Sequence, residues 1–263
     1  MEPDPTTLLE IAGIETPPIG FYDVVDPGPF ETLVESKGCV FAHYSDWLRG
    51  TSLRLSEGSC RCRGGSYWIG GVEFATRDSF ASGLNEREGF KVSNRLMEQW
   101  LADQKPYLIE RNVVVVGPLR DGQYEFLKTV TFLVNPDQLS LLLLGTEYHN
   151  PSADAYSTFT AFGSGCGQLA ALFGGLDDGE PRAIIGATDI AMRVHLPPDI
   201  LALTVNRPMY RQLCELGEDS FLYKSFWARL RAAREEEVRQ TQQDDRGQEI
   251  RQRRRLWRRA RGL

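Results

Sequence analysis

One pattern of residues occurs twice in this chain, and it constrains the fold more than any other feature. In residues 163–206, Cys166 lies among glycines and precedes an apolar helical run, a short apolar strand and a polar turn. Residues 39–60 show the same succession, with Cys39 at the start of a run that is apolar at helical spacing. The sequence therefore predicts two related halves, each with a cysteine at the beginning of a helix.

The two copies also correspond beyond their cysteines. Twenty-one residues after each cysteine, the chain reaches Cys60 in the first copy and Ala187 in the second, and each follows a short strand and a glycine turn. Residues 131–142 and 201–213 then both read as strand, Asn, Pro and helix. A strand–turn–helix unit also recurs by chance in α/β chains, so duplication and coincidence are both open at this point.

Strand and helix signals alternate along the chain. Residues 19–25, 112–119 and 128–134 are typical of strands, the last two being dense in β-branched residues, whereas residues 30–36 have a helical pattern. Asn135, followed by proline, marks the start of a helix. We therefore expect an α/β fold of mixed α+β character, in which two similar halves with a pseudo-twofold relation surround a mixed sheet. A basic helical tail is expected at the C-terminus.

The length of 263 residues and the hydrophobic content of 41% are sufficient for a complete core. We expect a single domain at residues 1–234, made of two related halves at about 14–150 and 151–234. Residues 235–263 form an Arg-rich tail, which we expect to be disordered or a frayed helix.

Charge is distributed unevenly between the body and the tail. Residues 229–263 contain twelve Arg against six acidic residues, a net +6, so with a total of −6 residues 1–228 carry −12. Such an acidic body argues against nucleic acid as a partner of the folded surface. The seven Arg of residues 251–261 are compatible with a contact to RNA or to an acidic partner, although a solvated tail is the simpler interpretation.

The sequence contains neither a membrane-span pattern nor a secretory signal. It has no run of about 18 apolar residues, and residues 1–11 are acidic and lack the basic and apolar regions of a signal peptide. Five cysteines, an odd number, are typical of reduced thiols. We therefore expect a cytoplasmic protein whose partner is a small molecule or a cofactor, and the sequence does not constrain its oligomeric state.

The cysteines are the main candidates for a functional site. A thiol at the start of a helix meets unpaired backbone N–H groups that favour the thiolate, a ligand suited to zinc and iron–sulfur clusters. The first hypothesis is therefore a metal or iron–sulfur cofactor bound between the halves through Cys39, Cys60 and Cys166. Three further residues are candidates for a fourth ligand: Cys62, His43 and Asp189. Because the chain has no C-x-x-C pair, small buried residues in tight turns are the simpler interpretation.

Two other functions are compatible with the sequence. One is a metal-free small-molecule binding module whose pocket is lined by glycine turns and aromatic residues, with candidates Gly64, Gly65, Tyr67, Trp68, Gly165, Gly167 and Thr188. The other is an enzyme with Cys39 or Cys166 as nucleophile and His43 or His195 as base. Phosphate-loop, dinucleotide-binding, G-x-S-x-G and H-E-x-x-H motifs are absent.

Several stretches carry a family resemblance: GSCRCRGGSYWIGG (58–71), KTVTFLVNPDQLSLLLL (128–144), GCGQ (165–168) and AIIGATDIAMR (183–193). With shorter matches across roughly residues 8–230, they resemble the family known as domain of unknown function 169, a group of bacterial and archaeal proteins. The resemblance implies that many members of the family have cysteines at the positions of Cys39, Cys60 and Cys166, and a fourth cysteine near the turn that corresponds to Ala187. This chain has Ala-Thr-Asp there, which argues against a cluster held by four equivalent thiolates.

Overall fold

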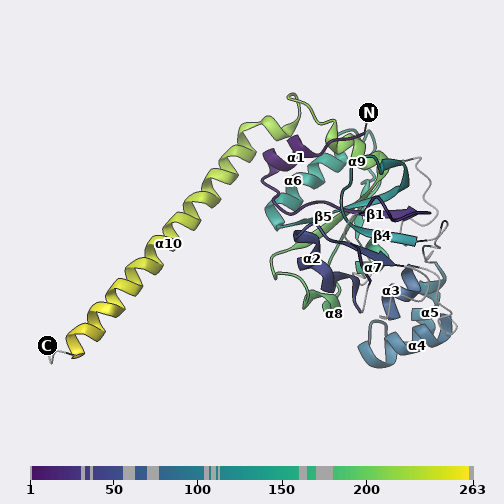
Figure 1. Ribbon diagram of the computed structural model, residues 1–263, viewed down its shortest axis with the longest axis horizontal. Coiled ribbons are helices and arrows are strands. Elements are labelled where there is room, and N and C mark those ends of the chain that lie inside the picture. Colours follow the sequence, from purple (N-terminus) through teal and green to yellow (C-terminus); the bar gives the residue numbers. More distant parts are fainter. Residues whose placement is uncertain are drawn as a thin grey trace. The chain divides into compact units, whose positions relative to one another are not determined.

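The computed structural model describes residues 2–30, 33–35, 38–55, 63–69, 77–103, 107, 111, 113–159, 165–169 and 180–260. These residues belong to two compact units, residues 1–216 and 217–263. The first unit contains the sheet and the helices that cover it, and the second is helical (Figure 1).

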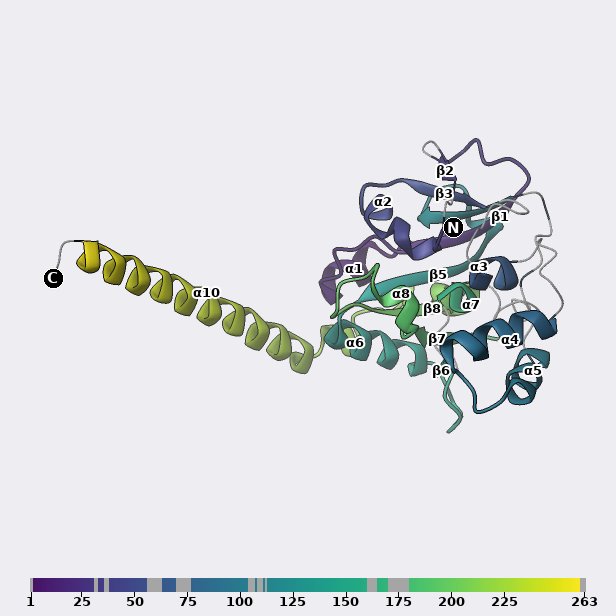
Figure 2. The same ribbon diagram turned by 90° about the horizontal axis from the view of Figure 1, so that it is seen from below.

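An eight-stranded sheet forms the centre of the first unit. Its strands are β1 (Ile19–Val24), β2 (Leu33–Glu35), β3 (Ser52–Leu55), β4 (Val113–Pro118), β5 (Leu127–Val134), β6 (Ser157–Phe159), β7 (Ala183–Gly186) and β8 (Leu201–Asn206). They lie in the order β2-β3-β4-β1-β5-β8-β7-β6, which Figure 2 shows from top to bottom. The pairs β2–β3 and β6–β7 are parallel and the others are antiparallel, so the sheet is mixed, as expected.

The strand order is the same on both sides of the central pair. From β1 outward the order is β1-β4-β3-β2, and from β5 outward it is β5-β8-β7-β6. In each direction the outermost pair is the parallel one. This order would place the division between two related halves between β4 and β5, whereas the division expected from the sequence lies at about residue 150. A pseudo-twofold relation of two halves stays a prediction.

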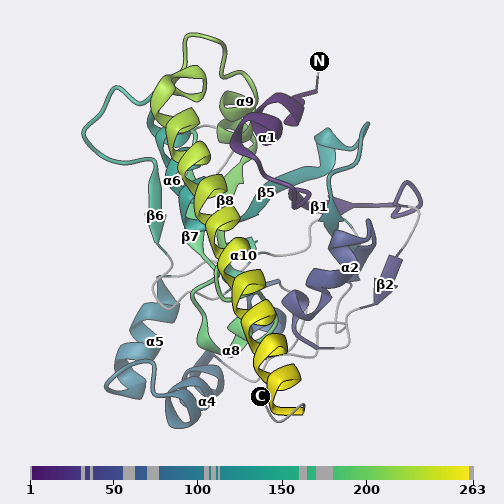
Figure 3. The same ribbon diagram turned by 90° about the vertical axis from the view of Figure 1, so that its left-hand side faces the viewer.

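Helices cover both faces of the sheet. One face carries α1 (Thr6–Ala12), α6 (Pro136–Glu147) and α9 (Arg207–Cys214). The other face carries η1 (Val40–His43), α2 (Tyr44–Leu48), α3 (Arg63–Trp68), α7 (Gly165–Leu169) and α8 (Ile190–Arg193) (Figure 1). Two further helices, α4 (Arg77–Glu88) and α5 (Asn94–Ala102), pack against each other (Figure 3). The predicted mixed α/β fold class is confirmed.

Local sequence signals set the start of α6. The Asn135 side chain accepts a hydrogen bond from the Gln138 backbone N–H (2.9 Å), and the Gln138 side chain accepts one from the Asn135 N–H (3.0 Å). Together they form a capping box, and Pro136 occupies the first helical position. The helix start predicted at Asn135 is confirmed.

The helical pattern of residues 30–36 is misleading. Residues 33–35 form β2, which pairs in parallel with residues 52–54 of β3. A strand of three residues is too short to establish a period of two, and its conformation comes from this pairing with a distant segment. The prediction of a helix here was therefore wrong.

Glu147, the last residue of α6, organises the loop that leads to β6. Its carboxylate accepts hydrogen bonds from Asn150 Nδ2 (2.6 Å), the Tyr156 N–H (3.0 Å) and the Ser157 hydroxyl (3.1 Å). Burial raises the pKa of the Glu147 carboxyl, but these hydrogen bonds outweigh burial and hold the pKa below its ordinary value of 4.5. The stability that Glu147 contributes is therefore complete above pH 4.5 and is lost as the pH falls through the lower pKa of the folded state.

We expect Glu147→Gln to lower the free energy of unfolding by about 1–2 kcal/mol near neutral pH, because the charged acceptor is lost. The difference from the parent protein should shrink below about pH 4, where the parent carboxylate also becomes protonated. Urea unfolding at both pH values measures this. Glu86→Gln, at an exposed position of α4, controls for the change of charge. A difference that stays constant with pH would contradict this role of the carboxylate.

The second unit contains η4 (Phe221–Tyr223) and α10 (Ser225–Ala260). Residues 231–242 are all exposed, and exposed ion pairs join Arg234 to Glu237 (2.9 Å) and Arg239 to Glu236 (3.0 Å). Such exposed pairs contribute little to stability. No described helix, α10 included, is long and apolar enough to cross a membrane.

We expect that deletion of residues 240–263 leaves the melting temperature within about 1 °C of the parent value. The reason is that the neighbouring turns of α10 bury no apolar side chain between residues 231 and 242. A thermal melt of the truncated protein measures this. A fall of several degrees would instead show that the tail packs on folded structure. The expectation that residues 235–263 are disordered or frayed stays a prediction.

Candidate functional site

The short helix α7 carries the second cysteine of the repeated pattern. All four residues from Gly165 to Gln168 are buried. A Cβ atom at Gly165 would overlap the ring of Phe41 in η1 and the Sδ atom of Met192 in α8. Glycine is therefore required here, because it lets the start of α7 lie directly against η1 and α8.

The two cysteines of the pattern are both associated with one large apolar cluster. Cys39 immediately precedes η1 and is half-buried, and Cys166 is the second residue of α7 and is 6% exposed. Cys166 belongs to the cluster that also contains Phe41, Trp47 and Met192, and Cys39 packs against it. Both thiols thus lie on the face of the sheet that carries η1, α2, α3, α7 and α8.

A buried glutamine joins α7 to the turn after β7. The Gln168 side chain is fully buried; its Oε1 accepts a hydrogen bond from the Ala187 N–H (3.0 Å) and its Nε2 donates one to the Ile184 carbonyl (3.3 Å). Ala187 has a φ of 61°, and it alone among the described non-glycine residues has a positive φ. Such a conformation costs about 1–2 kcal/mol for a residue with a Cβ, so the buried amide of Gln168 holds the turn in a strained shape.

The polar part of the same turn faces outward. Thr188 is exposed, and Asp189 is half-buried. Asp189 Oδ1 accepts a hydrogen bond from the Ala191 N–H (2.9 Å) and so caps α8. This capping role occupies one oxygen of the carboxylate proposed as a ligand.

The first glycine-rich candidate segment is helical. Gly64, Gly65, Tyr67 and Trp68 lie on α3, not in an open turn. Helix α3 packs against α7, so the segments containing Gly64 and Gly165 lie side by side. Gly64 and Tyr67 are half-buried, whereas Trp68 is 1% exposed and packs edge-on against Tyr67, with ring centroids 4.9 Å apart.

His43 is held by an acidic neighbour. Its Nδ1 lies 2.8 Å from Asp46 Oδ2, and Arg49 contacts the other carboxylate oxygen at 2.5 Å. The hydrogen bond from His43, followed by that from Arg49, outweighs burial and lowers the pKa of the Asp46 carboxyl. This contact fixes the ring of His43 and leaves Nε2 as its second polar atom. His195 is half-buried in the turn after α8, where its backbone N–H donates a hydrogen bond to the Met192 carbonyl (2.9 Å).

The predicted ligand set is only partly described. Cys60 and Cys62 lie outside the described residues. Within the described part of the chain, no group of three or more His, Cys, Asp or Glu side chains is placed to hold a metal ion. Of the predicted thiol ligands, Cys39 and Cys166 are described, and a ligand set shared by them stays a prediction.

A second buried polar group near α3 was missed by sequence reasoning. Asp23 in β1 is fully buried and accepts hydrogen bonds from the Tyr107 hydroxyl (2.5 Å) and the Arg111 N–H (3.2 Å). Tyr107 also donates its backbone N–H to the Trp68 carbonyl at the end of α3 (2.8 Å). An acidic residue inside the otherwise apolar segment 19–25 was the signal that could have identified this group.

Together, the fold and the site define a mixed α/β protein with a cysteine- and glycine-rich junction on one face of its sheet. The family model described as uncharacterised ArCR, domain of unknown function 169, matches residues 7–215, and the chain belongs to this family. No curated protein and no solved structure shows significant similarity to the chain.

Proposed function

We propose that this protein binds a thiolate-ligated cofactor, a metal ion or an iron–sulfur cluster, at the junction of η1, α7 and the turn after β7. Cys39 and Cys166 are the proposed ligands from the two halves, and Cys60 is the proposed third. The observation that carries the proposal is that Cys39 and Cys166, from distant parts of the chain, pack in the same apolar cluster. Thiolates require a reducing compartment, so the proposal includes a cytoplasmic location.

The apolar surroundings set a condition on the proposed site. Burial in an apolar environment raises the pKa of a thiol and keeps it protonated and unreactive. A bound metal ion reverses this effect, because its charge deprotonates a coordinating thiol. Ligation by Cys39 and Cys166 would therefore depend on the bound cation itself to deprotonate the thiols.

The fourth ligand position has three candidates, two of which are among the described residues. Asp189 already caps α8 with one oxygen. His43 binds Asp46 through Nδ1, the carboxylate–histidine arrangement that orients histidine ligands in metal sites, and its Nε2 is the atom that would coordinate. Cys62 is the remaining candidate of the set.

Single serine substitutions test the ligand set. We expect Cys39→Ser, Cys60→Ser and Cys166→Ser each to reduce cofactor content at least about tenfold after anaerobic purification, because serine keeps the shape but not the soft thiolate. Cys214→Ser is the matched control. Its thiol lies in α9, on the other face of the sheet, and burial raises its pKa to about 12. This variant should keep the cofactor and lose only about 1 kcal/mol of stability. Full cofactor content in Cys39→Ser and Cys166→Ser would refute the proposed site.

A thiol-nucleophile enzyme is the second candidate, and the His43–Asp46 contact favours it. A base oriented by a third group is the arrangement that activates a nucleophilic thiol. In this case Cys39 should react with iodoacetamide at least about tenfold faster than Cys214, and Asp46→Asn should slow that reaction. A cofactor-free protein whose cysteines react uniformly slowly would instead support the metal-free binding module.

A further inference from the structure

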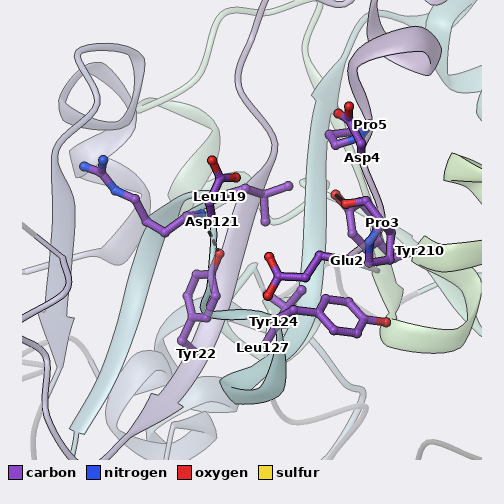
Figure 4. A pocket seen from close by; sticks show the side chains of 11 residues that line it. Glu2, Pro3, Asp4, Pro5, Tyr22, Leu119, Asp121, Tyr124, Leu127 and Tyr210 are labelled. Atoms are coloured by element: carbon purple, nitrogen blue, oxygen red, sulfur yellow. Dashed lines mark hydrogen bonds between the residues drawn. The ribbon is translucent and has the colours of Figure 1, made fainter.

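Charges of opposite sign are balanced around a cavity of about 240 Å³ whose walls include β1, α9 and residues near the N-terminus (Figure 4). The carboxylates of its lining lie near arginines. Arg120 is part of the lining, and the guanidinium groups of Arg207 and Arg211 lie 5.8 and 5.9 Å from the centroid of the Tyr124 ring, which also lines it. The cavity therefore has no surplus of either charge that would select an ion, in contrast to the C-terminal part of α10.

The last turns of α10 carry a concentration of positive charge. Residues 250–260, here called the basic segment, belong to this helix and contain no lysine and no acidic residue. They contain six arginines: Arg251, Arg253, Arg254, Arg255, Arg258 and Arg259. Residues 1–228, by contrast, carry a net charge of −12. An anionic partner is therefore attracted to the basic segment and not to the body.

The sequence of the basic segment assigns charged and apolar residues to different faces of the helix. Positions three, four and seven residues apart share one face of an α-helix. Four arginines have this spacing: Arg251, Arg254, Arg255 and Arg258. The apolar residues have it on another face: Ile250, Leu256, Trp257 and Ala260. Arg253 alone among the six arginines falls among the apolar positions, from which the long stem of an arginine can reach the polar side. The pattern is that of an amphipathic helix.

Both faces of such a helix have a partner at the surface of an anionic membrane. An interfacial helix places its apolar residues at the boundary of headgroups and acyl chains and its cations beside the anionic headgroups. Tryptophan is enriched at this depth. The phosphates of a nucleic acid would be bound by the arginines, and the apolar face would have no equivalent partner. The pattern therefore favours a lipid surface over RNA.

The close spacing of the arginines is a second argument for an anionic surface. Like charges three or four positions apart destabilise an isolated helix, and Arg251–Arg255 and Arg254–Arg258 are such pairs. Anionic headgroups neutralise these charges and remove the repulsion. Binding to the surface therefore stabilises the helix in the part of α10 where repulsion opposes it.

We propose that the basic segment binds the surface of membranes that contain anionic phospholipids. Ile250 and Trp257 enter the interface, and the arginines contact the headgroups. The helix lies in the plane of the surface and binds it reversibly. This interaction goes beyond the proposed cysteine cofactor and does not depend on it.

Co-sedimentation of the full chain with lipid vesicles tests the proposal. Vesicles of phosphatidylcholine alone are compared with vesicles that also contain about 30% phosphatidylserine. We expect at least about hundredfold tighter binding to the anionic vesicles, and at least about tenfold weaker binding when sodium chloride is raised from about 0.1 M to about 0.5 M. Equal binding to both kinds of vesicle, or no binding to anionic vesicles at about 1 mM lipid, would overturn the proposal.

A triple variant tests the arginine face. Arg251→Gln/Arg254→Gln/Arg258→Gln should bind anionic vesicles at least about tenfold more weakly than the parent. The matched control removes the same charge from exposed positions earlier in α10: Arg231→Gln/Arg234→Gln/Arg239→Gln. It should bind within about threefold of the parent, because these positions lie outside the basic segment. Equal losses in the two variants would show that the total charge determines binding, and would contradict the proposal.

The apolar face distinguishes a membrane from RNA as the partner. Ile250→Gln/Trp257→Gln keeps every charge and should still weaken vesicle binding at least about tenfold. Val238→Gln, at an exposed position of the same helix, is the control and should bind like the parent. Unchanged vesicle binding by the double variant would contradict insertion into the interface.

Competition and a cysteine variant complete the test. An RNA of about 20 nucleotides, added at the same concentration of phosphate as the anionic lipid, should leave most of the protein on the vesicles. Displacement of more than about half of the protein would overturn the proposal in favour of nucleic acid. Cys166→Ser should bind the vesicles like the parent even if it loses the cofactor, and weaker binding would contradict the independence of the two proposals.

Discussion

Gly165→Ala is expected to lower the free energy of unfolding by about 2–3 kcal/mol, the upper part of the range for overpacking a well-packed core. The new Cβ would overlap both Phe41 and Met192. Met192 has a flexible side chain, but Phe41 is 1% exposed and its ring packs edge-on against Trp47, with centroids 5.6 Å apart. The ring of Phe41 therefore has no space into which to move, and α7 must shift away from η1.

Gly64→Ala is the matched control for this substitution, because Gly64 also lies on a short helix of the same face and a Cβ there meets no described atom within 4 Å. Alanine should stabilise this position by about 0.5–1 kcal/mol through its helix propensity. Urea unfolding of both variants measures the difference. Equal effects at the two positions would contradict the close packing of α7 on η1.

Gln168→Leu is expected to cost about 2–4 kcal/mol, because it leaves the buried N–H of Ala187 without its acceptor and removes the donor to the Ile184 carbonyl. Besides the free energy of unfolding of the whole protein, the stability of the turn at Ala187 should fall, since fewer contacts then hold the left-handed conformation of this residue. Faster amide exchange in the turn after β7 is the expected signature.

Gln212→Leu makes the same change at a glutamine whose side-chain oxygen, unlike that of Gln168, accepts no hydrogen bond from the described residues. Its Oε1 is buried and has no hydrogen-bond partner among the described residues, so removing the amide should cost little or increase stability. Chemical unfolding of both leucine variants gives the comparison. A Gln168→Leu protein as stable as Gln212→Leu would contradict the role of Gln168 as the support of the turn.

The repeated sequence pattern predicted the surroundings of the two cysteines well. Strands β3 and β7 lie where the pattern predicts a short strand after each cysteine, and Cys39 and Cys166 both lie at the starts of helical segments. These features depend on local signals, namely apolar periodicity and turn residues, which a single sequence contains. Cys166 belongs to a large apolar cluster and Cys39 packs against it, while a site shared by the two cysteines stays a prediction.

Features that depend on contacts between distant segments were not predictable in this way. Gln168 is an ordinary polar residue until β7 places the strained turn at Ala187 beside it. Asp23 likewise meets Tyr107 and Arg111 only in the folded chain, because these partners lie 84 and 88 positions away in the sequence. The glycines at 64 and 65 suggested a turn, yet packing of α3 on α7 stabilises a helix there and offsets the unfavourable helix propensity of glycine.

The metal content of the parent protein, purified without oxygen, tests the central claim most directly. We predict about one metal ion or one cluster per chain, with broad absorbance near about 400 nm if the cofactor is an iron–sulfur cluster. In the same sample Cys39 and Cys166 should resist alkylation until a chelator removes the metal, because ligated thiolates are not available as nucleophiles. A metal-free protein in which both residues are alkylated at the same rate with and without chelator would contradict the proposed cofactor site.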